Sequence, residues 1–148
     1  MSLPYENATS GDKALGEIQK LLQRFGCNRF GVMTDWDDGI LLMQFEWNGL
    51  KVSFPASFKG YASAWLKENP WNNRKQATKE QWESKALEIG SVAVYSVLRD
   101  WIKANVTAVE TGLVTVDDVF MAHVLLPNGQ RMSEYAKAKN LLIGTATP

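Results

Sequence analysis

Cysteine and histidine are almost absent from this sequence, which has one of each in 148 residues. The single cysteine, Cys27, cannot form an internal disulfide. One cysteine and one histidine also cannot supply the four ligands of a closed zinc site. We therefore expect no disulfide framework and no structural metal, and no motif in the chain calls for a cofactor.

Long apolar runs are also missing. No segment approaches the roughly 18 consecutive apolar residues of a membrane span. The first six residues lack the basic start and the apolar stretch of a signal peptide. These two absences predict a cytoplasmic protein with no membrane attachment.

A net charge of one sign is the next absence, because lysine and arginine number 16 and so do aspartate and glutamate. Such a balance gives no overall attraction to nucleic acid. The distribution is uneven, however, since residues 51–103 contain nine basic and five acidic side chains, an excess of +4. A prediction of a binding site from charge therefore depends on this central excess of positive side chains.

Recognisable catalytic motifs are missing too. The chain has no glycine-rich phosphate loop, no nucleophile elbow and no paired His–Glu metal motif. We therefore predict a non-enzymatic protein and assign no catalytic residue. One alternative of a different class stays open, a small hydrolase or metal-dependent nuclease that uses Asp117, Asp118 and His123, with the histidine as a general base oriented by a carboxylate.

What is present is the composition of an ordinary globular domain, with 45% hydrophobic and 22% charged residues. A chain of this length is typical of one domain, and no repeat or long linker divides it. We predict a single domain over residues 1–148, with residues 1–10 as a flexible tail and residues 140–148 as a second tail.

The N-terminal third changes its hydrophobic period. Apolar residues at helical spacing predict a helix over residues 12–25, stopped by Gly26. Three apolar runs follow, at residues 30–34, 40–47 and 50–54, and the Asn48-Gly49 pair between the last two is a strong hairpin signal. The segment therefore predicts a three-stranded antiparallel meander, closed by Pro55.

Alternation along the second strand predicts which side chains face the core. One face carries Leu41, Met43 and Phe45, and the other carries Ile40, Leu42, Gln44 and Glu46. Because both faces are apolar near the start of the strand, we expect a helix or a second subunit over part of the outer face. A homodimer is therefore a secondary expectation.

The remaining elements are mostly helical. The pattern predicts a short helix over residues 57–67, a polar loop over 71–77 and a long helix from Thr78 to Gly112, in which Gly90 is unfavourable. A short helix follows the capping-box sequence 115–118, then a small hairpin around residues 127–129, and a last helix over 134–139 capped by Ser133. The predicted fold is α+β, with a three-stranded antiparallel meander packed on a long central helix and a small C-terminal hairpin and helix.

Basic and aromatic residues are interleaved between residues 59 and 85. Cations offset phosphate charge and aromatic rings stack on bases, so this combination is typical of nucleic-acid contacts. The opposing interpretation is ordinary packing, because Trp65 and Trp82 lie at helical spacings and three glutamates dilute the charge. Only Trp71, in the polar loop, is expected to be free for a partner. The predicted contact residues for a nucleic acid or a protein partner are Trp71, Arg74, Lys75, Lys79, Lys67 and Lys59.

Two segments carry a resemblance to a known family, KANVTAVETG at residues 103–112 and FMAHVLLPNG at residues 120–129. They resemble the C-terminal part of a small protein family that tailed bacteriophages encode near early or replication genes. The likeness covers mainly the last third of the chain. It implies a setting in the cytoplasm of an infected bacterium, and an accessory role in which a host protein or a nucleic acid is bound, either to support DNA replication and recombination or to inhibit a host defence or nuclease.

Overall fold

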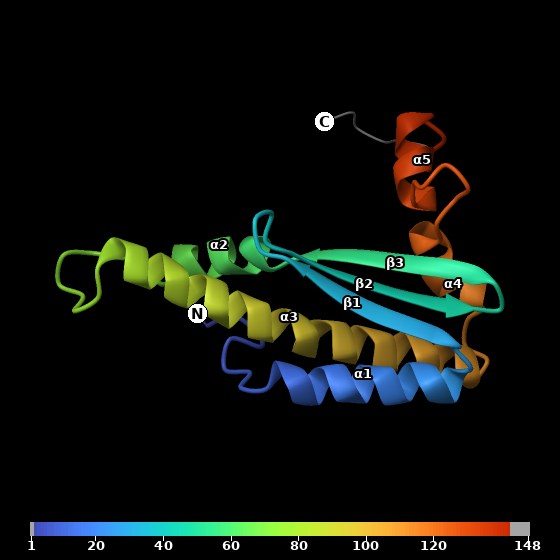
Figure 1. The fold of residues 1–148 in the computed structure, drawn as a ribbon, viewed down its shortest axis with the longest axis horizontal. Helices are drawn as coiled ribbons and strands as arrows, with labels where there is room; N and C mark the ends of the chain where they lie inside the picture. Colours follow the sequence, from blue (N-terminus) through green and yellow to red (C-terminus); the bar gives the residue numbers. More distant parts are fainter. Residues whose placement is uncertain (1, 143–148) are drawn as a thin grey trace.

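The computed structural model describes residues 2–142 and has a mixed α+β fold. Its elements are α1 (Gly11–Phe25), β1 (Arg29–Asp35), β2 (Ile40–Trp47), β3 (Leu50–Ser57), α2 (Phe58–Glu68), α3 (Lys79–Glu110), α4 (Val116–Phe120), the short 3-10 helix η1 (Met121–His123) and α5 (Met132–Ala138). Figure 1 shows the sheet on one side of α1 and α3, with α2 continuing beyond the end of the sheet.

Helix α1 begins and ends where its capping residues stand. The hydroxyl of Ser10 accepts a hydrogen bond from the backbone N–H of Lys13 at 3.2 Å, and Gly26 adopts a φ of 104° that favours glycine. Its buried side chains, Ile18 and Leu22 among them, face α3 and the sheet. The predicted first helix is confirmed.

The sheet is the predicted antiparallel meander, in the order β1-β2-β3. Asn48 and Gly49 both have positive φ, at 49° and 80°, as the tight turn between β2 and β3 requires. Leu41, Met43 and Phe45 are buried on the inner face, as the alternation predicted. The end of the third strand was predicted wrongly, because β3 continues through Pro55 to Ser57.

Helices α2 and α3 form an antiparallel hairpin at one end of the molecule (Figure 1). Helix α3 is unbroken over 32 residues, although Gly90 was expected to weaken it. Gly90 is buried where α2 crosses, and a Cβ there would lie 2.5 Å from the backbone oxygen of Phe58. The glycine therefore permits the close approach of the two helices. No helix in the described part of the chain, α3 included, is long and apolar enough to cross a bilayer.

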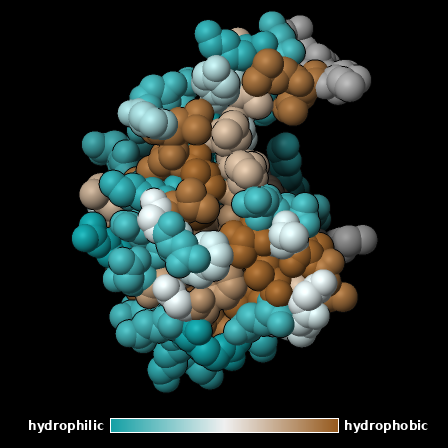
Figure 2. Space-filling model, turned by 90° about the vertical axis from the view of Figure 1, so that its right-hand side faces the viewer, coloured by the Kyte–Doolittle hydropathy of each residue, from teal (hydrophilic) through white to brown (hydrophobic). Residues whose placement is uncertain are grey.

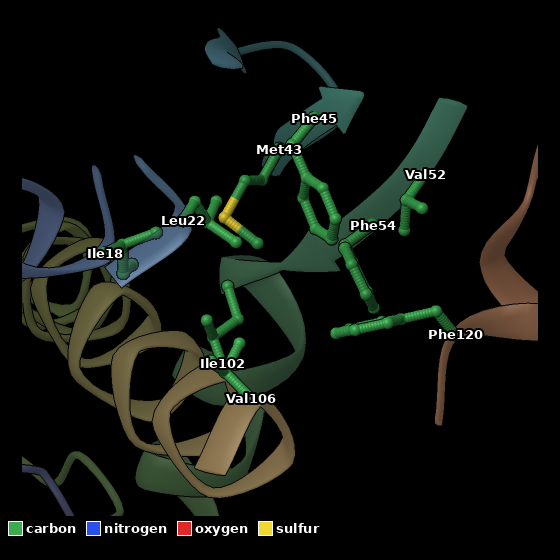
Figure 3. Close-up of a cluster of buried hydrophobic side chains, with 9 residues drawn as sticks. All are labelled: Ile18, Leu22, Met43, Phe45, Val52, Phe54, Ile102, Val106 and Phe120. Atoms are coloured by element: carbon green, nitrogen blue, oxygen red, sulfur yellow. The ribbon is translucent and has the colours of Figure 1, made fainter. Parts of the chain in front are cut away.

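The main core fills the space between the sheet and the helices. Figure 3 shows side chains from α1, β2, β3, α3 and α4 converging there, and Phe120 closes the cluster from the C-terminal side. Burying a large apolar side chain contributes about 1.5–3 kcal/mol. The nine members are Ile18, Leu22, Met43, Phe45, Val52, Phe54, Ile102, Val106 and Phe120.

The N-terminal segment, expected to be a flexible tail, is instead fixed against the helices. The Tyr5 hydroxyl donates to Asp100 at 2.7 Å, and the indole N–H of Trp65 donates to the carboxylate of Glu6 at 3.0 Å. Leu3 packs against the small cluster around Trp65. Contacts between residues this distant in sequence leave no local signal, so the prediction was wrong. Of the second predicted tail, residues 143–148 lie outside the described residues.

The C-terminal hairpin is present in its shortest form. Leu125 and Arg131 form a single bridge, and Val124 forms another with Val52 of β3. Helix α5 begins at Met132, so its N-cap is Arg131, two residues before the predicted cap at Ser133. The hairpin therefore lies against the edge of β3, so that β1 is the open edge of the sheet.

Candidate partner-binding site

The loop of residues 69–78 joins α2 to α3 at the far end of the helical hairpin (Figure 1). Its shape is held by tryptophan side chains, because the indole N–H of Trp82 donates to the backbone oxygen of Asn69 at 2.7 Å and that of Trp71 donates to Ala77 at 2.9 Å. Thr78 then caps α3 in a capping box with Gln81. The loop is therefore built on fixed anchor points.

Trp71 was expected to be an aromatic side chain free for a partner, and the structure gives it a different environment. It is half-buried, and its indole N–H is already bonded within the loop. Trp65 and Trp82 pack together with ring centroids 5.1 Å apart. The three indoles thus hold the hairpin and its loop together, and a partner would meet at most the exposed part of the Trp71 ring.

The cations of this region fall into two groups. Lys75 and Lys85 lie over the Trp82 ring, with Nζ at 4.8 and 5.0 Å from its centroid. Lys67, Arg74 and Lys79 are exposed, and none of them forms an ion pair with an acidic side chain of the described chain. We call Lys67, Arg74, Lys75 and Lys79 the basic tip. Residues 67–79 contain four basic side chains and one acidic one, so the net charge of this segment is +3.

Lys59 does not belong to the basic tip. It lies in the first turn of α2, about 12 Å along the helix from Lys67 in the last turn at 1.5 Å per residue. Its Nζ donates to the backbone oxygen of Asp37 at 2.7 Å, and its side chain packs over Gly39 in the turn between β1 and β2. The structure therefore separates Lys59 from the other predicted contact residues and engages it in holding that turn.

His123 lies among aromatic side chains rather than beside a carboxylate. Its ring centroid is 4.3 Å from that of Phe54 and 5.7 Å from that of Trp101. The Arg131 guanidinium, which can only donate, lies 3.3 Å from Nδ1. Burial, and secondly the positive charge of Arg131, lower the pKa of His123 below its usual value of 6.5. The side chain is therefore a neutral hydrogen-bond acceptor at pH 7.

The stability of the protein should fall as the pH drops below neutrality. Because the folded-state pKa of His123 is lowered, the unfolded chain binds the proton first, so stability is full above about pH 6.5 and declines as the pH falls through the lowered pKa. Urea unfolding between about pH 7.5 and 5.5, above the range of ordinary carboxylates, measures this decline. His123→Phe, which removes the only histidine, should flatten the profile; an equal slope in both proteins would contradict the assignment.

The two aspartates of the hydrolase hypothesis lie at the start of α4. Asp118 accepts a hydrogen bond from the backbone N–H of Thr115 at 3.0 Å, while its own N–H donates to the Thr115 hydroxyl at 3.2 Å. This capping, through the backbone and then the hydroxyl of Thr115, lowers the pKa of the Asp118 carboxyl. Asp117 is exposed. Within residues 2–142, no group of three His, Cys, Asp or Glu side chains is arranged to hold a metal ion.

The lone cysteine belongs to the core. Cys27 is half-buried and packs against the main cluster. Burial raises the pKa of its thiol to about 11, so the thiol is protonated at neutral pH.

Trp36 is an exposed aromatic residue that the sequence analysis did not select. It lies in the turn between β1 and β2, and 75% of its surface is exposed. The edge of its ring meets Phe58, and the acidic residues Asp35, Asp37 and Asp38 surround it in sequence. The signal available in the sequence was its place in a turn of acidic residues, where helical or strand packing does not bury a side chain.

The end of the molecule opposite the basic tip has a different character. Figure 2 looks onto this end and shows apolar side chains between the C-terminal helix and the body of the protein, among hydrophilic ones. Leu113, Met121 and Leu141 are 77%, 42% and 62% exposed. Exposed cations therefore gather at one end of α3, and several exposed apolar side chains lie at the other.

Comparison of the chain with protein-family models, with curated proteins and with solved structures finds no match.

Proposed function

We propose that this chain is a non-enzymatic accessory protein of a tailed bacteriophage, which binds a nucleic acid or a host protein in the cytoplasm of the infected bacterium. The basic tip is the proposed contact surface. In this role the protein supports phage DNA replication or recombination, or inhibits a host defence protein or nuclease.

The single observation that carries the proposal is the placement of exposed cations at the tip. Lys67, Arg74 and Lys79 are solvent-exposed and have no acidic side chain of residues 2–142 in an ion pair. Because no acidic side chain of residues 2–142 neutralises these cations, an anionic partner is favoured. Phosphate groups fit this surface because contacts to a nucleic-acid backbone need exposed cations and little shape specificity. The loop is fixed by its tryptophans, so little ordering accompanies binding.

The proposal is tested by fluorescence anisotropy with labelled single-stranded and duplex oligonucleotides, at about 50 and about 200 mM salt. We expect binding that weakens with salt. Arg74→Ala/Lys79→Ala should raise the dissociation constant on the order of tenfold at low salt and reduce the salt slope by about two for duplex DNA. These two residues are chosen because Lys75 also packs on Trp82, and its loss would change the loop.

The matched control is Lys137→Ala/Lys139→Ala, which removes two exposed charges from the C-terminal helix region. This variant should bind as the unmodified protein does. Equal weakening by both variants would show non-specific charge attraction, and no binding at either salt would reject the nucleic-acid form of the proposal. Loss of the labelled oligonucleotide in the presence of Mg²⁺ would instead favour the nuclease alternative with Asp117, Asp118 and His123.

A protein partner is the second candidate, and the exposure of Trp36 favours it. Tryptophan is enriched among the residues that contribute most to protein interfaces. Trp36 is 75% exposed at the start of the turn between β1 and β2, beside three aspartates. If oligonucleotides do not bind, capture from bacterial lysate with the unmodified protein and with Trp36→Ala identifies a partner whose binding depends on this side chain.

A further inference from the structure

The two edges of the sheet are not equivalent. The edge of β3 is occupied by Val124, which bridges to Val52, and by Leu125, whose N–H donates to the backbone oxygen of Lys51 at 2.8 Å. Pro55 further along β3 has no N–H to offer. β1 pairs with β2 alone in the described structure, so its other side presents unpaired backbone groups. An open strand of this kind is a template for pairing.

β1 lacks the features that protect an open edge. It has seven residues, no proline, no lysine and no bulge in its pairing with β2. Arg29 and Asp35, its two charged residues, stand at its two ends on the outer face, and Gly31 and Met33 lie between them on the same face. Met33 is 67% exposed, so no helix of the described chain covers this part of the outer face.

The strand is complementary to itself when a second copy runs antiparallel to it. Two residues that pair across neighbouring strands lie on the same face of the sheet. Since side chains alternate between the faces, the residue numbers of each pair are both odd or both even, and their sum is even. Pairing all seven residues then places a two-fold axis at Val32. In this register Arg29 of one copy lies opposite Asp35 of the other, twice by symmetry. A shift of two residues in either direction loses both opposite-charge pairs.

In the register that pairs the opposite charges, the shapes of the facing side chains are also complementary. Met33 of one copy lies opposite Gly31 of the other, and a Cβ at Gly31 would have no atom within 4 Å. The open space at Gly31 belongs to a shallow groove of about 380 Å³ on the outer face, which Leu42 and Gln44 also line. The exposed methionine of each copy therefore enters the space that the glycine of the other leaves empty.

We propose that a second copy of this chain docks on β1, antiparallel and centred on Val32, so that the two sheets join into one six-stranded sheet. Arg29 is available for this contact because its side chain is 75% exposed and its pair with Glu46 is long, at 3.7 Å. Asp35 uses one carboxylate oxygen to accept from the N–H of Asp38 at 3.0 Å, which leaves the other for the second copy.

Charge exchange tests both the dimer and its register. Asp35→Arg and Arg29→Asp each place like charges opposite one another in a homodimer, so each should raise the dimer dissociation constant roughly ten- to a hundredfold in sedimentation equilibrium. When the two variants are mixed, every pair becomes opposite in sign again. We therefore expect the mixture to form a heterodimer, and circular dichroism of each variant alone to remain that of the folded protein.

Asp117→Arg is the matched control, because it makes the same charge change on the exposed start of α4. It should leave dimerisation unchanged. The proposal is overturned if the unmodified protein is monomeric at about 100 μM, if the single variants dimerise as it does, or if folded variants stay monomeric when mixed. A monomer that binds an extended peptide of another protein through β1 would assign the same edge to a different occupant and would equally overturn the homodimer.

Discussion

Phe120→Ala should destabilise the protein by about 3–5 kcal/mol. Phe120 is 2% exposed, and its ring lies 5.5 Å from Phe45, 6.0 Å from Trp101 and 6.3 Å from Phe25, measured between centroids. The substitution removes these contacts and leaves a cavity. Because Phe120 joins the C-terminal segment to the main core, the segment after it should also lose protection from hydrogen exchange.

Urea unfolding followed by tryptophan fluorescence measures the change in free energy, and Met121→Ala is the control. Met121 is the next residue and is 42% exposed, so its truncation should change stability by no more than about 0.5 kcal/mol. If Phe120→Ala costs less than about 1 kcal/mol, α4 does not close the core as described.

Gly90→Ala should destabilise the protein by about 1–3 kcal/mol, although alanine is the better helix former. A Cβ at this position would lie 2.5 Å from the backbone oxygen of Phe58 and 3.3 Å from the backbone nitrogen of Ala62. Both atoms belong to the backbone of α2, so the clash is not relieved by rotating a side chain. Helices α2 and α3 must move apart, which also loosens the Trp65–Trp82 pair.

The control for Gly90 is the same substitution at Gly16 in α1. A Cβ there would meet no atom within 4 Å, so Gly16→Ala should stabilise the protein by about 0.5–1 kcal/mol. Opposite signs for the two variants, read from thermal or urea unfolding, are the expected result. A gain in stability for Gly90→Ala would show that the two helices are not in close contact at this point.

Local signals were sufficient for most of the fold. The first helix, the three strands and the long helix follow from hydrophobic periodicity and from caps or turns such as Gly26 and Asn48-Gly49. The face assignment of β2 is confirmed for the same reason, since it depends only on alternation. Gly90 was read as unfavourable because intrinsic propensity does not include the close approach of α2.

The candidate site was less accessible to sequence reasoning, because its chemistry depends on contacts between distant residues. Arg74 is exposed, as its place in a polar loop predicted, whereas Lys59 is engaged by a turn 22 residues earlier in the chain. The inward-facing indole of Trp71 and the aromatic surroundings of His123 likewise follow from three-dimensional packing. An exposed aromatic was therefore expected at Trp71 and is found at Trp36.

The unequal edges of the sheet also set the number of neighbours that each chain can accept by strand addition. A sheet with two open edges can pair with two other sheets, so its copies can add one after another into a filament. Here Val124 and Leu125 occupy the β3 edge at Val52 and Lys51, and Pro55 further along offers no N–H to another strand. In the proposed dimer the β1 edge of each chain is used by its partner, so this pairing leaves only the interrupted β3 edges and favours a closed pair over a filament.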